Sequence, residues 1–150
     1  MSVRFQLVID CADPVRQTAF WAAALGYVPE PVPAGHATWK AYYRSLGVPE
    51  DELAGMADDE VDSVVDPDGA GPRIWFQPVP EGKVVKNRLH LDIRIADRTA
   101  PLETRREQVD TEVERLTGLG ASVVRVLAEP GMDHYGVTMH DPEGNEFCVA

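Results

Sequence analysis

Residues 5–13 (FQLVIDCAD) and residues 89–97 (LHLDIRIAD) decide the fold, because the second stretch repeats the first at an offset of 84 positions. Apolar side chains recur at every second position in both stretches, and this period predicts a half-buried β-strand in each. Four identical pairs coincide under the offset: Leu7 with Leu91, Ile9 with Ile93, Ala12 with Ala96, and Asp13 with Asp97. The chain is therefore expected to contain two copies of one structural module.

A helix is predicted directly after each of these strands. Asp13 suits the N-cap, Pro14 suits the first helical position, and Gly26 suits the position just past the end, which predicts a helix over 14–25. Apolar residues at helical spacing predict the second helix over about 103–118. Each module thus opens with a strand followed by a helix.

The remainder of each half is interpreted as three further strands. A similar turn precedes the last strand of each half, DPDG at 66–69 and DPEG at 141–144. Because each helix covers only one face of its strands, the other face is free to line a cavity. The predicted fold class is α+β, with two βαβββ modules forming a curved mixed sheet around a cleft and a helical insert at about 38–57 in module one.

The length of 150 residues predicts one domain, with module one over 1–82 and module two over 83–150. The formal net charge of −11 argues against nucleic acid and anionic membranes as partners. The longest nearly apolar run, residues 20–28, is too short to span a bilayer, and the first ten residues lack a signal-peptide layout. Two cysteines without metal-knuckle spacing fit free thiols in a reducing, cytoplasmic setting.

Alternation along the two opening strands also assigns faces. The apolar set, expected against the helices, is Phe5, Leu7, Ile9, Leu89, Leu91 and Ile93. The opposite face holds Gln6 and Val8 in module one and His90, Asp92 and Arg94 in module two. Polar groups there either meet solvent or line the cleft. Asp92 either orients the imidazole of His90 or binds a polar substrate, and the alternative is a structural ion pair.

Two further features carry alternative interpretations. Trp39 in the insert, with its neighbouring tyrosines, predicts either an apolar cleft wall that contacts ligand or an ordinary core cluster. The stretch KVVKNR at 83–88 is the single basic cluster of an acidic chain. It either meets an anionic substrate or serves as a solvated linker between the modules.

The stretches FQLVIDCADPVRQTAFWAAALGY (5–27), RLHLDIRIAD (88–97) and VTMHDPEGNEFCVA (137–150) resemble the vicinal oxygen chelate superfamily, which includes glyoxalase I, bleomycin-resistance proteins and extradiol dioxygenases. The resemblance spans essentially the whole chain. Within the superfamily, the chain most closely resembles glyoxalase-like domain proteins of the actinobacterial type.

The resemblance implies where a divalent metal would be held. Carried onto this sequence, the opening-strand positions are Gln6 and His90, and the last-strand positions are Gln77 and Cys148. Cys148 stands where relatives usually carry a glutamate, and Glu146 lies two residues earlier. A set of Gln6, Gln77, His90 and Cys148 lacks a carboxylate, so no metal or other cofactor is expected, and His90 is expected to work without one.

Three hypotheses follow from the resemblance. The first is a small-molecule-binding protein whose cleft is lined by Gln6, Gln77, His90, Asp92 and Cys148, acting as a lyase or isomerase with His90 as general acid/base. The second is a non-catalytic protein that sequesters a drug or metabolite, and the third is a metal-dependent glyoxalase or dioxygenase. A homodimer is expected, because relatives often pair and sheet edges are exposed.

Overall fold

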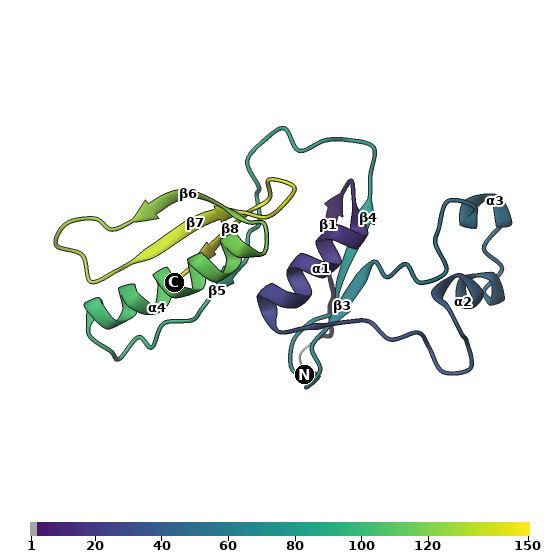
Figure 1. Ribbon diagram of the computed structural model, residues 1–150, viewed down its shortest axis with the longest axis horizontal. Coiled ribbons are helices and arrows are strands. Elements are labelled where there is room, and N and C mark those ends of the chain that lie inside the picture. The colour runs from purple at the N-terminus through teal and green to yellow at the C-terminus, as the bar shows by residue number, and fades with distance from the viewer. Residues whose placement is uncertain (1–2) are drawn as a thin grey trace. The chain divides into compact units, whose positions relative to one another are not determined.

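The computed structural model describes residues 3–150, and the chain divides into two compact units (Figure 1). Module one comprises the residues up to Ala22 together with Gly26–Val79, and module two comprises Ala23–Leu25 together with Pro80–Ala150. The division falls close to the predicted boundary between 82 and 83. That the two modules form one domain stays a prediction.

Module one is built on a four-stranded mixed sheet with the strand order β1-β4-β3-β2. The strands are β1 (Leu7–Cys11), β2 (Val28–Pro29), β3 (Ser63–Val65) and β4 (Ile74–Pro78). β1 pairs in parallel with β4, and the other pairs are antiparallel. Its helices are α1 (Pro14–Leu25), whose last turn belongs to the second unit, and α2 (Trp39–Ser45) and α3 (Glu50–Leu53), which form the predicted insert.

Module two repeats this topology with the strand order β5-β8-β7-β6. Its strands are β5 (Asp92–Ile93), β6 (Ser122–Leu127), β7 (Gly136–His140) and β8 (Glu146–Val149). The helix α4 (Leu102–Gly118) packs on β6, β7 and β8 (Figure 1). The α+β class with two mixed sheets is therefore confirmed.

The ends of α1 lie where the sequence predicts them. The Asp13 carboxylate accepts a hydrogen bond from the Arg16 backbone N–H at 3.0 Å, which satisfies one of the free donors of the first turn. Gly26 ends the helix with φ at 68°, a left-handed conformation that glycine adopts without steric penalty. The local sequence alone is thus sufficient to place this helix.

Both opening strands are shorter than predicted. β1 begins at Leu7 and β5 contains only two residues. Phe5 and Leu89, expected against the helices, precede the strands and are 70% and 86% exposed, so their predicted placement is wrong. Alternation specifies which face a residue takes, but the length of a strand depends on its partner. β4 begins at Ile74, directly after Gly71, Pro72 and Arg73, and the ladder to β1 ends there.

The core of module two lies between its sheet and α4. It contains Val109 and Leu116 from the helix, both fully buried, and Met139 and Phe147 from neighbouring strands. Their burial leaves the other face of the sheet available for a site. Across residues 3–150, no helix combines the length and the apolar character that a bilayer crossing needs.

Candidate active site

The sheet of module two separates a buried face from a pocket face. Val137, Met139, Phe147 and Val149 alternate along β7 and β8 and are at most 1% exposed, so they form the face against α4. The residues between them point the other way. Thr138 pairs with Cys148 and His140 pairs with Glu146 on this second face.

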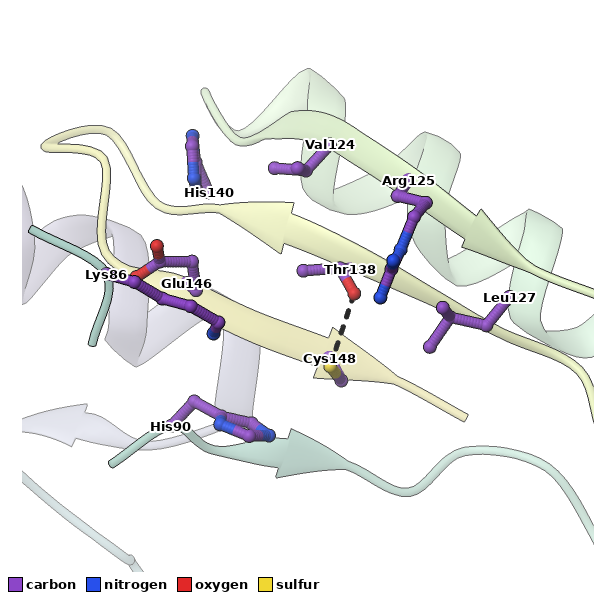
Figure 2. Close-up of a pocket in the computed structure, with 9 residues that line it drawn as sticks. All are labelled: Lys86, His90, Val124, Arg125, Leu127, Thr138, His140, Glu146 and Cys148. Atoms are coloured by element: carbon purple, nitrogen blue, oxygen red, sulfur yellow. Dashed lines mark hydrogen bonds between the residues drawn. The ribbon is translucent and has the colours of Figure 1, made fainter. Parts of the chain in front are cut away.

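A pocket of about 630 Å³ lies over this second face (Figure 2). This volume is within the range of sites that bind small organic molecules. The lining residues come from β6, β7, β8 and the segment that precedes β5, all within module two: Lys86, His90, Val124, Arg125, Leu127, Thr138, His140, Glu146 and Cys148. His90 and Cys148, two of the predicted site residues, therefore share one pocket.

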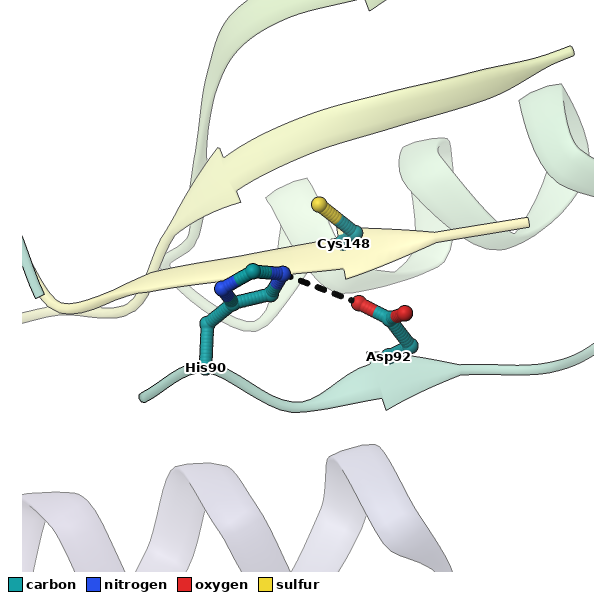
Figure 3. Close-up of side chains that lie close together, drawn as sticks. All are labelled: His90, Asp92 and Cys148. Carbon is teal, nitrogen blue, oxygen red and sulfur yellow. Dashed lines mark ion pairs between the residues drawn. The ribbon is translucent and has the colours of Figure 1, made fainter. Parts of the chain in front are cut away.

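His90, Asp92 and Cys148 form a cluster at the edge of the pocket (Figure 3). His90 Nε2 lies 3.3 Å from Asp92 Oδ1, and both side chains are roughly half exposed. Parallel pairing sets Asp92 beside Cys148, and one potential ligand atom from each of the three residues lies within 4.8 Å of the others. The cluster is thus assembled by the β5–β8 ladder.

The neighbours of the cluster are held by hydrogen bonds. Cys148 Sγ lies 3.6 Å from Thr138 Oγ1, and either atom can donate. Glu146 accepts the Asn87 backbone N–H at 2.9 Å and lies 3.2 Å from Lys83 Nζ. The amide hydrogen bond, assisted by Lys83, lowers the pKa of Glu146 to about 2, so this carboxylate stays ionised.

In module one, the corresponding positions hold a different set of side chains. Gln6 Oε1 accepts a hydrogen bond from Arg73 at 2.9 Å. The ladder sets Val8 beside Trp75, as it sets Asp92 beside Cys148, so Trp75 rather than Gln77 is the counterpart of Cys148.

Gln77 pairs with Asp10, and Gln6 lies at the opposite end of the same ladder. The structure therefore groups His90, Asp92 and Cys148, but it does not group Gln6 with Gln77. The roles of Gln6 and Gln77 in ligand binding stay predictions.

Trp39 begins α2 and is only 6% exposed. Its indole N–H donates to the Glu30 backbone carbonyl at 3.2 Å, and its ring lies 5.6 Å from the rings of Tyr42 and Tyr43. These contacts favour the core interpretation of the aromatic cluster. A ligand contact by Trp39 stays a prediction.

Sequence reasoning did not identify Arg125, Thr138 or Lys86 as individual pocket residues. Thr138 could have been found, because it alternates with the buried residues of a strand that was predicted. The pocket position of Arg125 could not have been predicted, because it depends on a β-bulge between Val123 and Arg125. No sequence pattern marks that bulge.

The donor set of the cluster can be tested against the divalent metal that the resemblance implies. The expected set lacked a carboxylate, whereas the structure brings the carboxylate of Asp92 beside His90 and Cys148. Nitrogen, sulfur and one oxygen donor suit Zn²⁺ or Fe²⁺, while Mg²⁺ prefers oxygen alone. Donors on a tetrahedral zinc lie roughly 3.5 Å apart, so a small rotation of side chains would close the cluster around such an ion. The residues fit a borderline-soft ion.

Comparison with known proteins identifies the family. The family model described as "Glyoxalase-like domain" matches residues 6–150. None of the curated proteins matches the chain. Similar solved structures include a glyoxalase/bleomycin resistance protein/dioxygenase family enzyme from Burkholderia phytofirmans PsJN, with 17% identity, 96% of this chain and 94% of that chain covered, and a TM-score of 0.57.

Two more solved structures share the fold. A mutant of the fosfomycin resistance protein FosX of Listeria monocytogenes has 13% identity, 99% and 89% coverage of this chain and that chain, and a TM-score of 0.60. A hypothetical protein of S. aureus has 16% identity, 99% and 96% coverage and a TM-score of 0.56. Because the family model spans residues 6–150, the chain belongs to the glyoxalase-like domain family.

Proposed function

We propose that the protein binds a small organic molecule in the pocket of module two and that His90 acts on it as a general acid/base, in a lyase or isomerase reaction. The observation that carries this proposal is the pairing of His90 with Asp92 at 3.3 Å on the rim of the pocket. An imidazole held by a carboxylate beside a pocket is a common arrangement for proton transfer.

The pairing gives the two ring nitrogens separate tasks. Asp92 lies beside Nε2, which favours the tautomer with the proton on Nε2 and leaves the lone pair on Nδ1 (Figure 3). Nδ1 would then take a proton from a carbon next to a substrate carbonyl, and Asp92 would stabilise the resulting imidazolium. Return of that proton to the opposite face of the same carbon completes an epimerisation, one kind of isomerisation, with no other reactant.

A second candidate is metal-dependent chemistry, because three different donor types lie within 4.8 Å of one another. His90, Asp92 and Cys148 would hold the ion. When bound, such an ion would polarise a substrate carbonyl or a water molecule. The FosX structure from L. monocytogenes contains Mn(II) and a dihydroxypropylphosphonic acid, which supports a metal in the superfamily, although the thiol here suits a softer ion.

Elemental analysis of natively purified protein tests these candidates. His90→Ala removes one donor of the cluster, and His134→Ala is a matched control on an exposed loop of the same module. The acid/base proposal expects no stoichiometric metal in either protein. Stoichiometric zinc or iron that disappears in His90→Ala and persists in His134→Ala would overturn it in favour of the metal enzyme.

A thermal-shift screen of small organic molecules then separates catalysis from sequestration. A ligand present at 100 times its Kd stabilises the folded state by about 2.7 kcal/mol, which such a screen resolves. The proposal expects the wild-type protein to convert a bound hit and His90→Ala to bind the same hit without converting it. Binding without conversion by the wild-type protein would favour a sequestering protein.

A further inference from the structure

The pocket of module two collects basic side chains in a strongly acidic protein. The chain carries a net charge of −11, yet Lys86, Arg125, His90 and His140 line this pocket. Glu146 is the single carboxylate in the lining that the structure describes. A local excess of positive charge favours the binding of anions in the pocket. The acidic groups elsewhere on the protein are farther away, and salt screens their repulsion.

Glu146 does not neutralise this excess. Its carboxylate is already paired with Lys83 at 3.2 Å and accepts the Asn87 amide. Asp92, beside the pocket, is paired with His90. Within residues 3–150, Lys86 and Arg125 have neither a hydrogen bond nor an ion pair from their side chains, so both cations are available to a ligand.

The β-bulge in β6 is what brings Arg125 to the pocket. Ser122 pairs with His140 and Val123 with Met139, so a regular strand would place residue 125 opposite the buried Val137, on the face against α4. Instead, the bulge leaves Val124 unpaired and Arg125 pairs with Thr138 on the pocket face. Bulges of this kind re-aim side chains beside functional sites.

The position of Arg125 also limits the size of a ligand. β5 and β6 are the two edges of the sheet, and at about 4.8 Å per strand spacing they are roughly 14 Å apart. Figure 2 shows Arg125 reaching from β6 toward Thr138, while His90 lies beside β5 on the other side of Cys148. A group held by Arg125 thus places the rest of a small molecule near His90.

We propose that this pocket takes a small organic acid and that Arg125, together with Lys86, binds its carboxylate, phosphate or phosphonate group. The planar guanidinium donates two parallel hydrogen bonds to any of these oxyanions, and the Thr138 hydroxyl is close enough in the ladder to assist. This inference rests on the proposed function, because it names the class of molecule on which His90 would act.

The test is a titration of the ¹⁵N-labelled chain of residues 1–150, followed by NMR. Benzoate and phenylphosphonate are the anionic probes, and benzamide has the same ring without the charge. Arg125→Gln removes the cation, Arg125→Lys keeps the charge, and Arg98→Gln is a matched control on an exposed loop of module two. Preference between benzoate and phenylphosphonate distinguishes a carboxylate ligand from a phosphorus oxyanion.

We expect the acids to shift the resonances of Thr138, Arg125 and Cys148 in the wild-type protein. Arg125→Gln should weaken their binding roughly 10- to 100-fold, as the loss of a hydrogen bond to a charged group predicts, while Arg98→Gln should not. Arg125→Lys should restore part of the affinity, and added salt should weaken the acids but not benzamide.

Equal affinity for benzamide and benzoate, or unchanged acid binding in Arg125→Gln, would overturn the inference and leave the proposed pocket intact. Acid-induced shifts confined to residues outside the pocket would also overturn it. If neither acids nor amide bind at the pocket, the proposed function fails together with the inference.

Discussion

Replacing Glu30 with Gln in module one should destabilise that module by about 2 kcal/mol. Glu30 Oε2 accepts hydrogen bonds from Ser63 Oγ and Arg73 Nε, both at 2.7 Å. The side chains of Glu30 and Arg73 are only 22% and 29% exposed, so water screens their charges weakly. Arg73 in turn donates to Gln6, so Glu30 fixes the start of β1 through one intermediary.

The magnitude follows from these contacts. A hydrogen bond to a charged group contributes about 1.5–3 kcal/mol, and one between neutral groups contributes about 0.5–1.5. Gln keeps the shape and the two acceptor contacts but loses the charge, so each bond weakens by about 1 kcal/mol. For a chain of this size, a loss of about 2 kcal/mol lowers Tm by roughly 4–8 °C.

The assay is urea unfolding followed by tryptophan fluorescence. All three tryptophans of the chain, at positions 21, 39 and 75, lie in module one, so the signal reports this module. Glu50→Gln is the matched control, because it removes the same charge from an Arg–Glu pair whose side chains are 51% and 64% exposed. The control should change stability little.

The effect should also depend on pH with a defined sign. Burial alone would raise the pKa of Glu30, but hydrogen bonds from Arg73 and Ser63 outweigh it and hold the pKa below its ordinary value of 4.5. A carboxyl group whose pKa is lowered by folding stabilises the folded state above its unfolded pKa and loses this contribution as the pH falls. The difference between wild type and Glu30→Gln should therefore be full at pH 7 and shrink below pH 4.5. Equal effects of Glu30→Gln and Glu50→Gln, or a difference that grows toward acid pH, would refute the reasoning.

Three shorter predictions concern the fold and the pocket. Phe147→Ala removes a side chain that is 1% exposed between β8 and α4, and we expect it to cost about 3–5 kcal/mol of stability by urea unfolding followed by far-UV circular dichroism. Gly26→Ala places a Cβ at φ 68°, and we expect a loss of about 1 kcal/mol in the same assay, although nothing lies within 4 Å of the added atom. In the native protein, iodoacetamide should modify Cys148, which lines the pocket, faster than Cys11, which is 3% exposed. Peptide mass spectrometry measures the two modification rates. Equal rates would contradict the assigned burial of the two thiols.

The sequence was most informative where a local rule decides the structure. Asp13, Pro14 and Gly26 bound α1 because capping depends only on neighbouring residues, and the repeat led to a fold and family that the structure and comparisons confirm. Strand lengths were not predictable in the same way, because each strand ends where its partner does. The expected homodimer and cytoplasmic location stay predictions.

The candidate site was predictable only in part for a related reason. His90 and Cys148 were named from the repeat and the resemblance, and the structure places both in one pocket. The pattern His-x-Asp sets His90 and Asp92 on the same strand face, so Asp92 could also have been added to the possible metal donors from the sequence. Arg125 could not have been assigned to the pocket from the sequence. A bulge changes the sheet face of every residue beyond it, and few sequence signals mark a bulge.

The two modules share a topology but use equivalent positions for different purposes. In module one, Gln6 and Arg73 at the entrance to the β1–β4 ladder are tied to each other and to Glu30, so their polar groups are occupied in holding the strands. In module two, the equivalent His90 has only Asp92 as a charged partner among the residues that the structure describes, and it faces a pocket.

A duplicated fold can thus divide its tasks between the copies. Gln6, Arg73 and Glu30 are linked by hydrogen bonds at the start of the β1–β4 ladder and contribute to stability. By contrast, the two cations that line the pocket of module two, Lys86 and Arg125, lack partners within the described chain. Unpartnered charge beside a pocket contributes nothing to stability and is most useful to a ligand of opposite charge. This asymmetry favours the pocket of module two as the place where a substrate binds, and it favours small acids as the first ligands to test.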